Sequence, residues 1–196
     1  MAYKFRGGVH PDYAKTAKDS PVRTIAPPEY VVQPMIQHIG VPNKPQVKVG
    51  DTVKMGQLIG YDEAPISAPI HASVSGKVIA VEPRRHMLGD MVMSVVIEND
   101  FQDTPCEDMQ PLTPEQLKDP DAIIARIREA GVVGMGGAMF PTAFKIAGAR
   151  GKVDTVIING AECEPYLCGD HRTMLEHPEE LLKGIELVKI AHGLDK

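Results

Sequence analysis

Between residues 31 and 102, short β-branched segments alternate with glycine turns. Of all features of the sequence, this pattern limits the possible folds most strongly. Residues 47–49 run into Gly50, and Leu58-Ile59 runs into Gly60. Short β-branched segments that are separated by turn residues are typical of strands. The pattern therefore predicts an all-β domain over residues 31–102.

A weak internal repeat points to two similar halves in this domain. Residues 49–53, VGDTV, are echoed by residues 88–92, LGDMV, at a separation of roughly forty residues, which is within the range of structural repeats. Two similar strand-turn-strand halves favour a quasi-symmetric sandwich.

Residues 47–81 resemble the barrel-sandwich hybrid of biotinyl and lipoyl carrier domains. In the biotinyl pattern the modified lysine follows Glu-Ala-Met, whereas residues 63–66 here read Glu-Ala-Pro-Ile. Because the carrier lysine is missing, we expect a scaffold or docking surface without a covalent cofactor.

Composition and charge exclude several classes of function. The 196 residues carry a formal net charge of -5, 5% aromatic residues and no tryptophan, so no nucleic acid partner is expected. The N-terminal residues lack the apolar centre of a signal peptide, and no stretch approaches the ~18 consecutive apolar residues of a membrane span. We expect a cytoplasmic chain without a membrane span of its own.

The three cysteines, Cys106, Cys163 and Cys168, are an odd number in a chain without a secretory signal, which favours reduced thiols. Cys163, Cys168 and His171 offer too few ligands for a structural zinc site, and iron-sulfur clusters usually take four thiolates. No metal site is predicted. Nothing in the sequence places a histidine beside a thiol for nucleophilic catalysis.

Three segments frame the β domain. Residues 1–30 contain prolines and little periodicity, which predicts an extended arm. Residues 103–120 are acidic and also contain prolines, as is common in linkers. Asp119 at the N-cap, Pro120 at the first helical position and Gly131 after the end predict a helix between them.

Residues 121–196 carry helix, loop, helix, strand, loop and helix in succession. A glycine-rich segment, 131–138, precedes a second helix at about 141–148, a buried strand is predicted at 153–158, and the last helix at about 178–193. This order is the beginning of an α/β domain, so the fold class expected for the chain is α+β. We expect the domain to be truncated, because the strands are too few for a complete sheet.

The glycine-rich segment could approach a ligand closely. Residues 134–145 read GMGGAMFPTAFK, and close glycines let a backbone lie against a flat or phosphorylated molecule, next to a helix N-terminus and Lys145. The dinucleotide fingerprint fails because Met139 stands where a third small residue is required, and the Gly-Lys-Ser/Thr of the P-loop is absent. The alternative is a packed turn between two helices.

A polar stretch, residues 159–172, follows the carboxyl end of the predicted strand. Open α/β sheets bind ligands at this position, and the stretch NGAECEPYLCGDHR combines carboxylates, an amide and two thiols. A solvated loop is the alternative interpretation.

Together, the glycine-rich segment and the polar stretch resemble the flavin-binding region of the C subunits of Rnf complexes, which are ferredoxin:NAD oxidoreductases. They are also similar to the FMN- and NADH-binding subunit of respiratory complex I. Residues 5–11, FRGGVHP, and the carrier-like module match the Rnf branch. The resemblance covers nearly the whole chain and implies that residues 121–196 are the first part of an FMN- and NADH-binding α/β domain.

The resemblance also implies which residues contact FMN and NAD(H). The implied backbone contacts are Gly134, Gly136, Gly137 and Ala138 of the glycine loop. The implied side-chain contacts are Phe140, Lys145, Asn159, Glu162 and Glu164, with Glu164 as the candidate catalytic residue. Ala161 departs from the complex I pattern, in which an acidic residue stands at this position.

The function implied is that of an electron-transfer subunit in a membrane-bound, ion-translocating complex, passing electrons between NAD(H), FMN and iron-sulfur clusters. The CxxCxxCxxxCP runs that hold the 4Fe-4S clusters of the family are absent from this sequence, so we expect the chain by itself to be inactive. The implied partners are other complex subunits and ferredoxin-like carriers, at the cytoplasmic face of the plasma membrane. The alternatives are a soluble relative that feeds an amino-acid reductase and a non-catalytic docking module.

Overall fold

The computed structural model describes residues 11–108, 110–135, 137 and 139–194. The chain forms two compact units. The larger consists of residues 25–156 and 187–196, and the smaller of residues 1–24 and 157–186.

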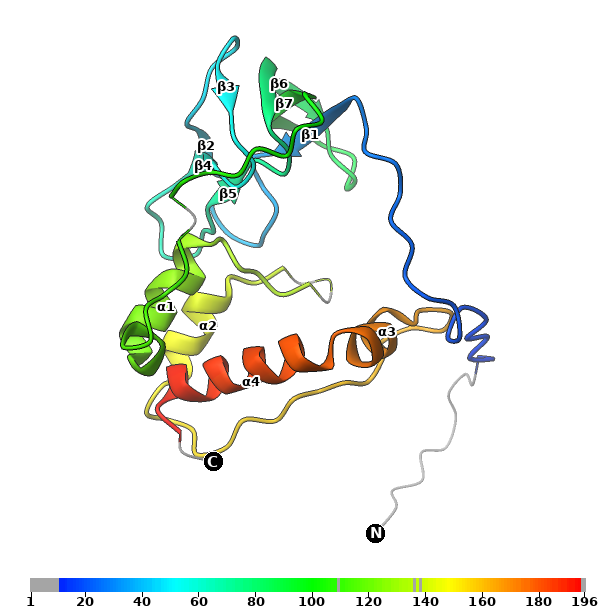
Figure 1. Cartoon of the computed structure of the whole chain (residues 1–196), viewed down its shortest axis with the longest axis vertical. Coiled ribbons are helices and arrows are strands. Elements are labelled where there is room, and N and C mark those ends of the chain that lie inside the picture. Colours follow the sequence, from blue (N-terminus) through cyan, green and yellow to red (C-terminus); the bar gives the residue numbers. More distant parts are fainter. Residues whose placement is uncertain (1–10, 109, 136, 138, 195–196) are drawn as a thin grey trace. The chain divides into compact units, whose positions relative to one another are not determined.

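The larger unit is built on a β sandwich of two antiparallel sheets (Figure 1). One sheet has the strand order β1-β7-β6-β3 and the other β2-β4-β5. The strands are β1 Tyr30–Pro34, β2 Lys44–Pro45, β3 Thr52–Val53, β4 Leu58–Tyr61, β5 Ile70–His71, β6 Gly76–Arg85 and β7 Met91–Asn99. The sandwich predicted from the strand and turn pattern is confirmed.

Apolar side chains from both sheets form a single core in the sandwich. Its buried members are Met35, Val53, Ile59, Ile70, Ala72, Val74, Val78, Val95 and Ile97. The sequence repeat survives as a pair of turns, since Gly50 and Gly89 have similar backbone φ angles of 95° and 102°. The strands that follow differ, because β3 has 2 residues and β7 has 9, so the symmetry does not extend beyond the turns.

Two helices follow the sandwich in the larger unit. α1, Pro120–Glu129, begins where the Asp119 side chain accepts the N–H of Asp121, and it ends before Gly131, as predicted. A 3-10 turn, Gln116–Lys118, precedes it, and α2, Thr142–Ala149, follows Pro141. Both pack around a second, smaller core whose buried residues are Ile123, Ile146 and Ala191. Ala191 comes from α4, Pro178–His192.

The loop that carries the modified lysine in carrier domains is a contact surface for α1 here. Residues 63–66 lie between β4 and β5, and Arg128 donates to the carbonyls of Ala64 at 3.2 Å and Glu63 at 3.4 Å. A Cβ at Gly131 would come within 2.1 Å of the Pro69 carbonyl oxygen, so the chain leaves α1 in direct contact with the same loop. This loop therefore connects the sandwich to the helices.

The predicted strand at residues 153–158 is wrong. These residues form no strand, and Ile157 exposes 86% of its surface. All strands of the two sheets lie between residues 30 and 99, so no described strand offers hydrogen-bond partners to this apolar segment. Backbone N–H and C=O groups gain a sheet only through a paired neighbour.

The smaller unit joins the described N-terminal residues to the polar stretch. It contains α3, Gly169–Glu176, and the first turns of α4. The backbone N–H of Tyr166 donates to the carbonyl of Tyr13 at 2.9 Å, and Arg172 donates to the carbonyl of Lys18 at 3.2 Å. None of the helices in the described part of the chain has the length and apolar character needed to cross a membrane.

Candidate functional site

The glycine-rich segment is the tip of a short hairpin, which we call the glycine hairpin (residues 132–142). The N–H of Thr142 donates to the carbonyl of Val132, and the N–H of Gly134 donates to the carbonyl of Phe140, both at 3.0 Å. Val133 and Pro141 form an antiparallel bridge. Paired backbone groups therefore hold the base of the segment.

The tip of this hairpin has a left-handed backbone. Gly137 has a φ of 99°, and no atom of the described residues lies within 4 Å of the position that a Cβ would take there. Met139 has a φ of 46°, and its carbonyl accepts the N–H of Ile39 from the sandwich at 3.2 Å. A residue with a side chain would be strained at Gly137, while the space beside it is open to a ligand.

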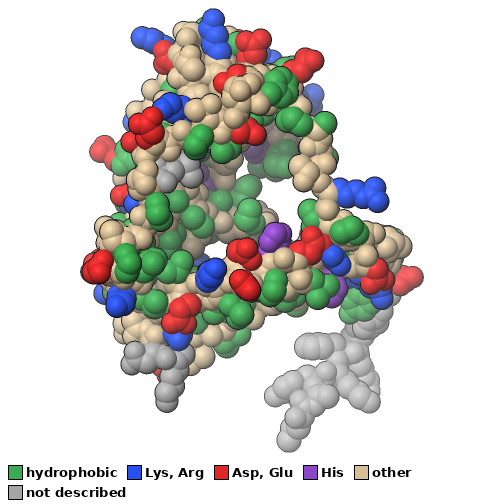
Figure 2. Space-filling view, viewed as in Figure 1, with side chains coloured by type: hydrophobic (Ala, Val, Ile, Leu, Met, Phe, Trp, Pro, Cys, Tyr) green, Lys and Arg blue, Asp and Glu red, His purple; other side chains and the backbone are tan. Residues whose placement is uncertain are grey.

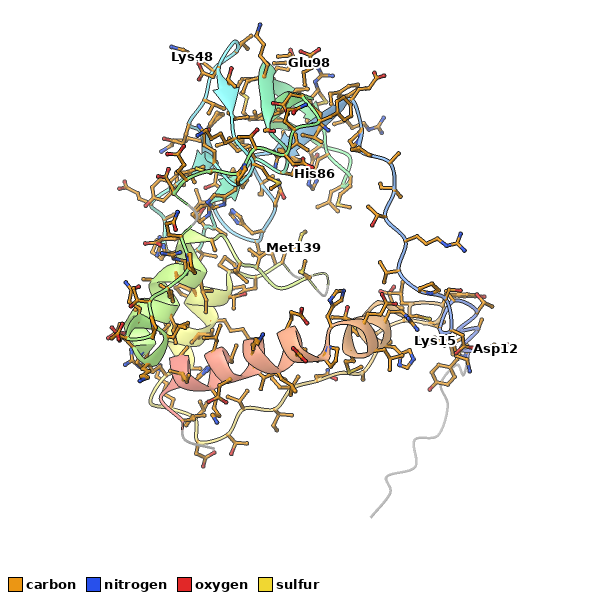
Figure 3. The ribbon with its side chains drawn as sticks, in the orientation of Figure 1. Asp12, Lys15, Lys48, His86, Glu98 and Met139 are labelled. Carbon is orange, nitrogen blue, oxygen red and sulfur yellow. The ribbon has the colours of Figure 1, made fainter. Side chains whose placement is uncertain are left out.

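A pocket of about 400 Å³ lies between the glycine hairpin and the sandwich. Figure 3 labels one residue from each side, Met139 on the glycine hairpin and His86 on the turn between β6 and β7. The lining residues are Pro34, Gln37, His86, Met87, Val133, Gly134, Met135 and Met139. The volume falls within the ~300–1,000 Å³ of small-molecule sites.

The predicted site residues of this unit take different positions. Gly134 lines the pocket, whereas Phe140 and Lys145 do not. The Phe140 ring packs edge to face against Phe144, with centroids 5.9 Å apart. Lys145 is exposed on α2, and its ammonium has no partner among the described residues. Gly136 and Ala138 lie outside the described residues.

The predicted residues of the smaller unit come from the polar stretch, and two of them already hold the local backbone. The side chain of Asn159 accepts the N–H of Ala161 at 3.0 Å. Glu162 accepts the N–H of His171 at 3.1 Å and so caps the first turn of α3. Glu164 is exposed, and no described residue bonds its carboxylate. Of the predicted acidic contacts, the carboxylate of Glu164 is therefore the more available to a ligand.

The thiols are separate in the described part of the chain. All three cysteines are free, and Cys168 is buried with its Sγ 3.4 Å from the carbonyl of Tyr166. Among the described residues, no group of three or more His, Cys, Asp and Glu side chains is arranged to hold a metal.

Four pocket residues from the sandwich were missed by the sequence analysis: Pro34, Gln37, His86 and Met87. The Leu88-Gly89-Asp90 motif indicates a turn near His86. It carries no information about which distant segment the turn approaches, because the contact with the glycine hairpin spans about fifty residues of sequence.

A larger groove of about 700 Å³ lies elsewhere on the larger unit, between β4, β5 and the end of α1. It contains none of the predicted site residues. Its charged groups are engaged within the protein, since Arg126 pairs with Glu129 at 3.1 Å and also donates to the carbonyl of Gln110. The smaller pocket is the better candidate, because it is lined by the predicted site residue Gly134.

Charge on the face seen in Figure 2 is mixed. Lysine and arginine side chains are interspersed there with aspartate and glutamate, and they do not gather into a basic patch on that face. This distribution agrees with the net charge of -5. It gives no support to a nucleic acid surface there.

Two family models match the chain. Residues 3–102 match the RnfC barrel sandwich hybrid domain, and residues 127–196 match the Nuo51 FMN-binding domain. The first match covers the β sandwich, and the second covers the glycine hairpin and the polar stretch.

Relatives from three bacteria are similar over almost all of the chain. The C subunit of the Na⁺-translocating ferredoxin:NAD⁺ oxidoreductase complex of Acetobacterium woodii is 48% identical over 98% of the chain and 44% of the relative. The C subunit of the proton-translocating ferredoxin:NAD⁺ oxidoreductase complex of Clostridium ljungdahlii is 43% identical over 100% of the chain and 43% of the relative. The C subunit of the ion-translocating oxidoreductase complex of Rhodobacter capsulatus is 42% identical over 99% of the chain and 38% of the relative. The chain thus spans less than half the length of these relatives.

Proposed function

This chain belongs to the RnfC family, and from that membership we propose that it acts in the C subunit of an ion-translocating ferredoxin:NAD oxidoreductase. In this role it passes electrons between NAD(H), FMN and the iron-sulfur clusters of the complete protein. Its partners are the other complex subunits and ferredoxin-like carriers, and its place is peripheral, at the cytoplasmic face of the membrane.

The observation that carries this proposal is the glycine hairpin. It lies within the region that matches an FMN-binding domain, its tip has a glycine in the left-handed region, and a pocket of about 400 Å³ lies beside it. Open space at Gly137 is what the close approach of a flat ring to the backbone requires. The residues present therefore fit a flavin.

The proposed roles of the site residues follow from their chemistry. Bound FMN would supply the hydride and single-electron chemistry. The glycine hairpin, from Gly134 through Gly136, Gly137 and Ala138, offers backbone contacts, Phe140 an aromatic surface and Lys145 a cation. The amide of Asn159 and the carboxylates of Glu162 and Glu164 offer polar contacts to the flavin or the nicotinamide, with Glu164 as the proposed catalytic residue.

The test is flavin binding by the full-length subunit with Gly137→Val. Valine at a φ of 99° costs about 1–3 kcal/mol of strain and places two methyl groups in the open space beside the loop. We expect FMN occupancy, measured by absorbance of the purified protein, to fall to near zero while circular dichroism stays unchanged.

The matched control is Gly50→Val. Gly50 has a φ of 95° and equally open surroundings, but it lies in the turn before β3 and not in the glycine hairpin. It imposes the same strain, so it should lower thermal stability similarly and leave FMN occupancy intact. Full occupancy in Gly137→Val would reduce the glycine hairpin to a structural turn and favour the docking-module alternative.

A further inference from the structure

The turn between β6 and β7 brings a histidine to the pocket beside the glycine hairpin. His86 and Met87 line this pocket together with Val133, Gly134 and Met139. The sandwich thus contributes side chains to a site whose other wall belongs to the region matching an FMN-binding domain.

The hydrogen bonds of the turn fix the His86 ring and its tautomer. The N–H of His86 donates to the carbonyl of Asp90 at 2.7 Å, and the N–H of Gly89 donates to the carbonyl of His86 at 2.9 Å. The N–H of Leu88 donates to Nδ1 of His86 at 3.3 Å. Because Nδ1 accepts this bond, the neutral ring carries its proton on Nε2. No described residue accepts from that Nε2–H.

The other lining residues define the kind of ligand group that fits. Most are apolar: Pro34, Met87, Val133, Met135 and Met139. The amide nitrogen of Gln37 already donates to the carbonyl of Pro34 at 3.2 Å. The described lining contains no lysine or arginine. Such a pocket suits the faces of a flat heteroaromatic ring with an acceptor at its edge, and not a phosphate group.

We propose that His86 is a flavin-contacting residue, donating a hydrogen bond from Nε2–H to an acceptor on the edge of the isoalloxazine ring. This inference rests on the proposed function. The β sandwich then forms one wall of the flavin site, with the β6–β7 turn holding the ring against the glycine hairpin.

The test compares His86→Asn with His86→Gln in the full-length subunit. The Asn oxygen can accept the Leu88 N–H as Nδ1 does, so the turn is kept while the donor to the ligand is lost. The Gln amide can reach the position of Nε2 and supply an N–H. For His86→Asn we expect the Kd for FMN, measured by fluorescence quenching, to rise about 3- to 10-fold. We also expect a shift of the bound-flavin absorption spectrum, and both changes should be smaller in His86→Gln.

Arg85→Ala is the control, because Arg85 is the last residue of β6, directly before His86, and does not line the pocket. Unchanged FMN affinity and spectrum in His86→Asn, with binding still abolished by Gly137→Val, would overturn the inference and leave the proposed function standing. Equal losses in Arg85→Ala and His86→Asn would also overturn it, since both would then act through the fold of the turn. Failure of the unaltered protein to bind FMN would refute the proposed function itself.

Discussion

Gly134 and Gly137 lie in the same hairpin, but a side chain would have different consequences at each. A Cβ at Gly134 would meet only the backbone of Phe140, at 3.7 and 3.8 Å, which is ordinary contact. We predict that Gly134→Ala changes the free energy of unfolding by less than about 0.5 kcal/mol. It should nevertheless weaken FMN binding, because Gly134 lines the pocket. Chemical denaturation and flavin titration separate the two effects, and equal affinity in both proteins would place the ring away from Gly134.

His71 should make the stability of the sandwich depend on pH. Burial lowers its pKa below the ordinary value of 6.5 because the interior disfavours the charged ring. The unfolded chain then binds more protons, so this contribution to stability is complete above about pH 6.5 and is lost as the pH falls through the lowered pKa. We predict that urea midpoints decline from pH 7.5 to pH 5 more steeply in the unaltered protein than in His71→Gln. Parallel profiles would contradict this assignment.

The candidate site residues show which properties can be predicted from the sequence and which cannot. Gly137 was a candidate because of the resemblance to the flavin-binding region, and the structure gives it the backbone conformation that glycine favours. The same resemblance made Asn159 and Glu162 candidates, yet their side chains also form a local turn and a helix cap. The sequence identifies a polar side chain. The partner of that side chain depends on distances in the folded protein, which the spacing of residues in the sequence does not give.

At the scale of elements, capping residues decided which helices could be predicted. Asp119, Pro120 and Gly131 mark both ends of α1, and Pro178 and Gly193 mark those of α4. α3 was missed because its N-cap, Cys168, provides no side-chain cap, and the cap comes instead from Glu162 earlier in the chain. The strand expected at 153–158 failed for a related reason, since strands depend on partners more than on their own residues.

A lysine from the N-terminal segment holds the polar stretch in the smaller unit. The ammonium of Lys15 (Figure 3) donates to the carbonyls of Glu164, at 2.9 Å, and Leu167. Between them, Tyr166 has a φ of 68°, which is a strained value for tyrosine. We predict that Lys15→Met lowers the local stability of residues 164–168 by about 1–3 kcal/mol, because bonds from a charged donor are lost. Hydrogen exchange followed by mass spectrometry would detect faster exchange in this segment.

Lys18→Met is the matched control for this effect. The Lys18 side chain has no described partner, and only the backbone carbonyl of Lys18 accepts a bond from Arg172. Exchange in the polar stretch should therefore stay as it is in the unaltered protein. Equal acceleration in both variants would mean that positive charge, and not the Lys15 hydrogen bonds, protects the segment.

At the scale of the whole molecule, the sequence predicts a β sandwich followed by the first part of an α/β domain. It does not predict the pocket between the β6–β7 turn and the glycine hairpin. Turn residues and the spacing of apolar residues are local signals, and they were sufficient to predict the sandwich and three helices that follow it, α1, α2 and α4. The approach of the β6–β7 turn to the glycine hairpin is a long-range contact. It depends on the packing of α1 on the β4–β5 loop through Arg128 and Gly131.

The larger unit contains two apolar cores, and we predict that they lose structure separately. Ile97 belongs to the sandwich core and Ile123 to the helical core, and both are almost completely buried. Truncation of either to alanine should cost about 2–5 kcal/mol, through lost burial and the cavity that remains. In native-state hydrogen exchange, Ile97→Ala should accelerate exchange in β1, β6 and β7. Ile123→Ala should accelerate exchange in α1, α2 and the last turns of α4.

The helical core should be the weaker of the two, because among the described residues it contains three buried side chains while the sandwich core contains nine. Local opening of the helical core would release the base of the glycine hairpin, since Val132 and Thr142 directly adjoin α1 and α2. We therefore expect Ile123→Ala in the full-length protein to lower FMN affinity more than Ile97→Ala does, even at equal cost in stability. Equal acceleration of exchange in both cores by either variant would show that the unit opens as one cooperative body. The pocket beside the glycine hairpin would then be only as stable as the sandwich that forms its wall.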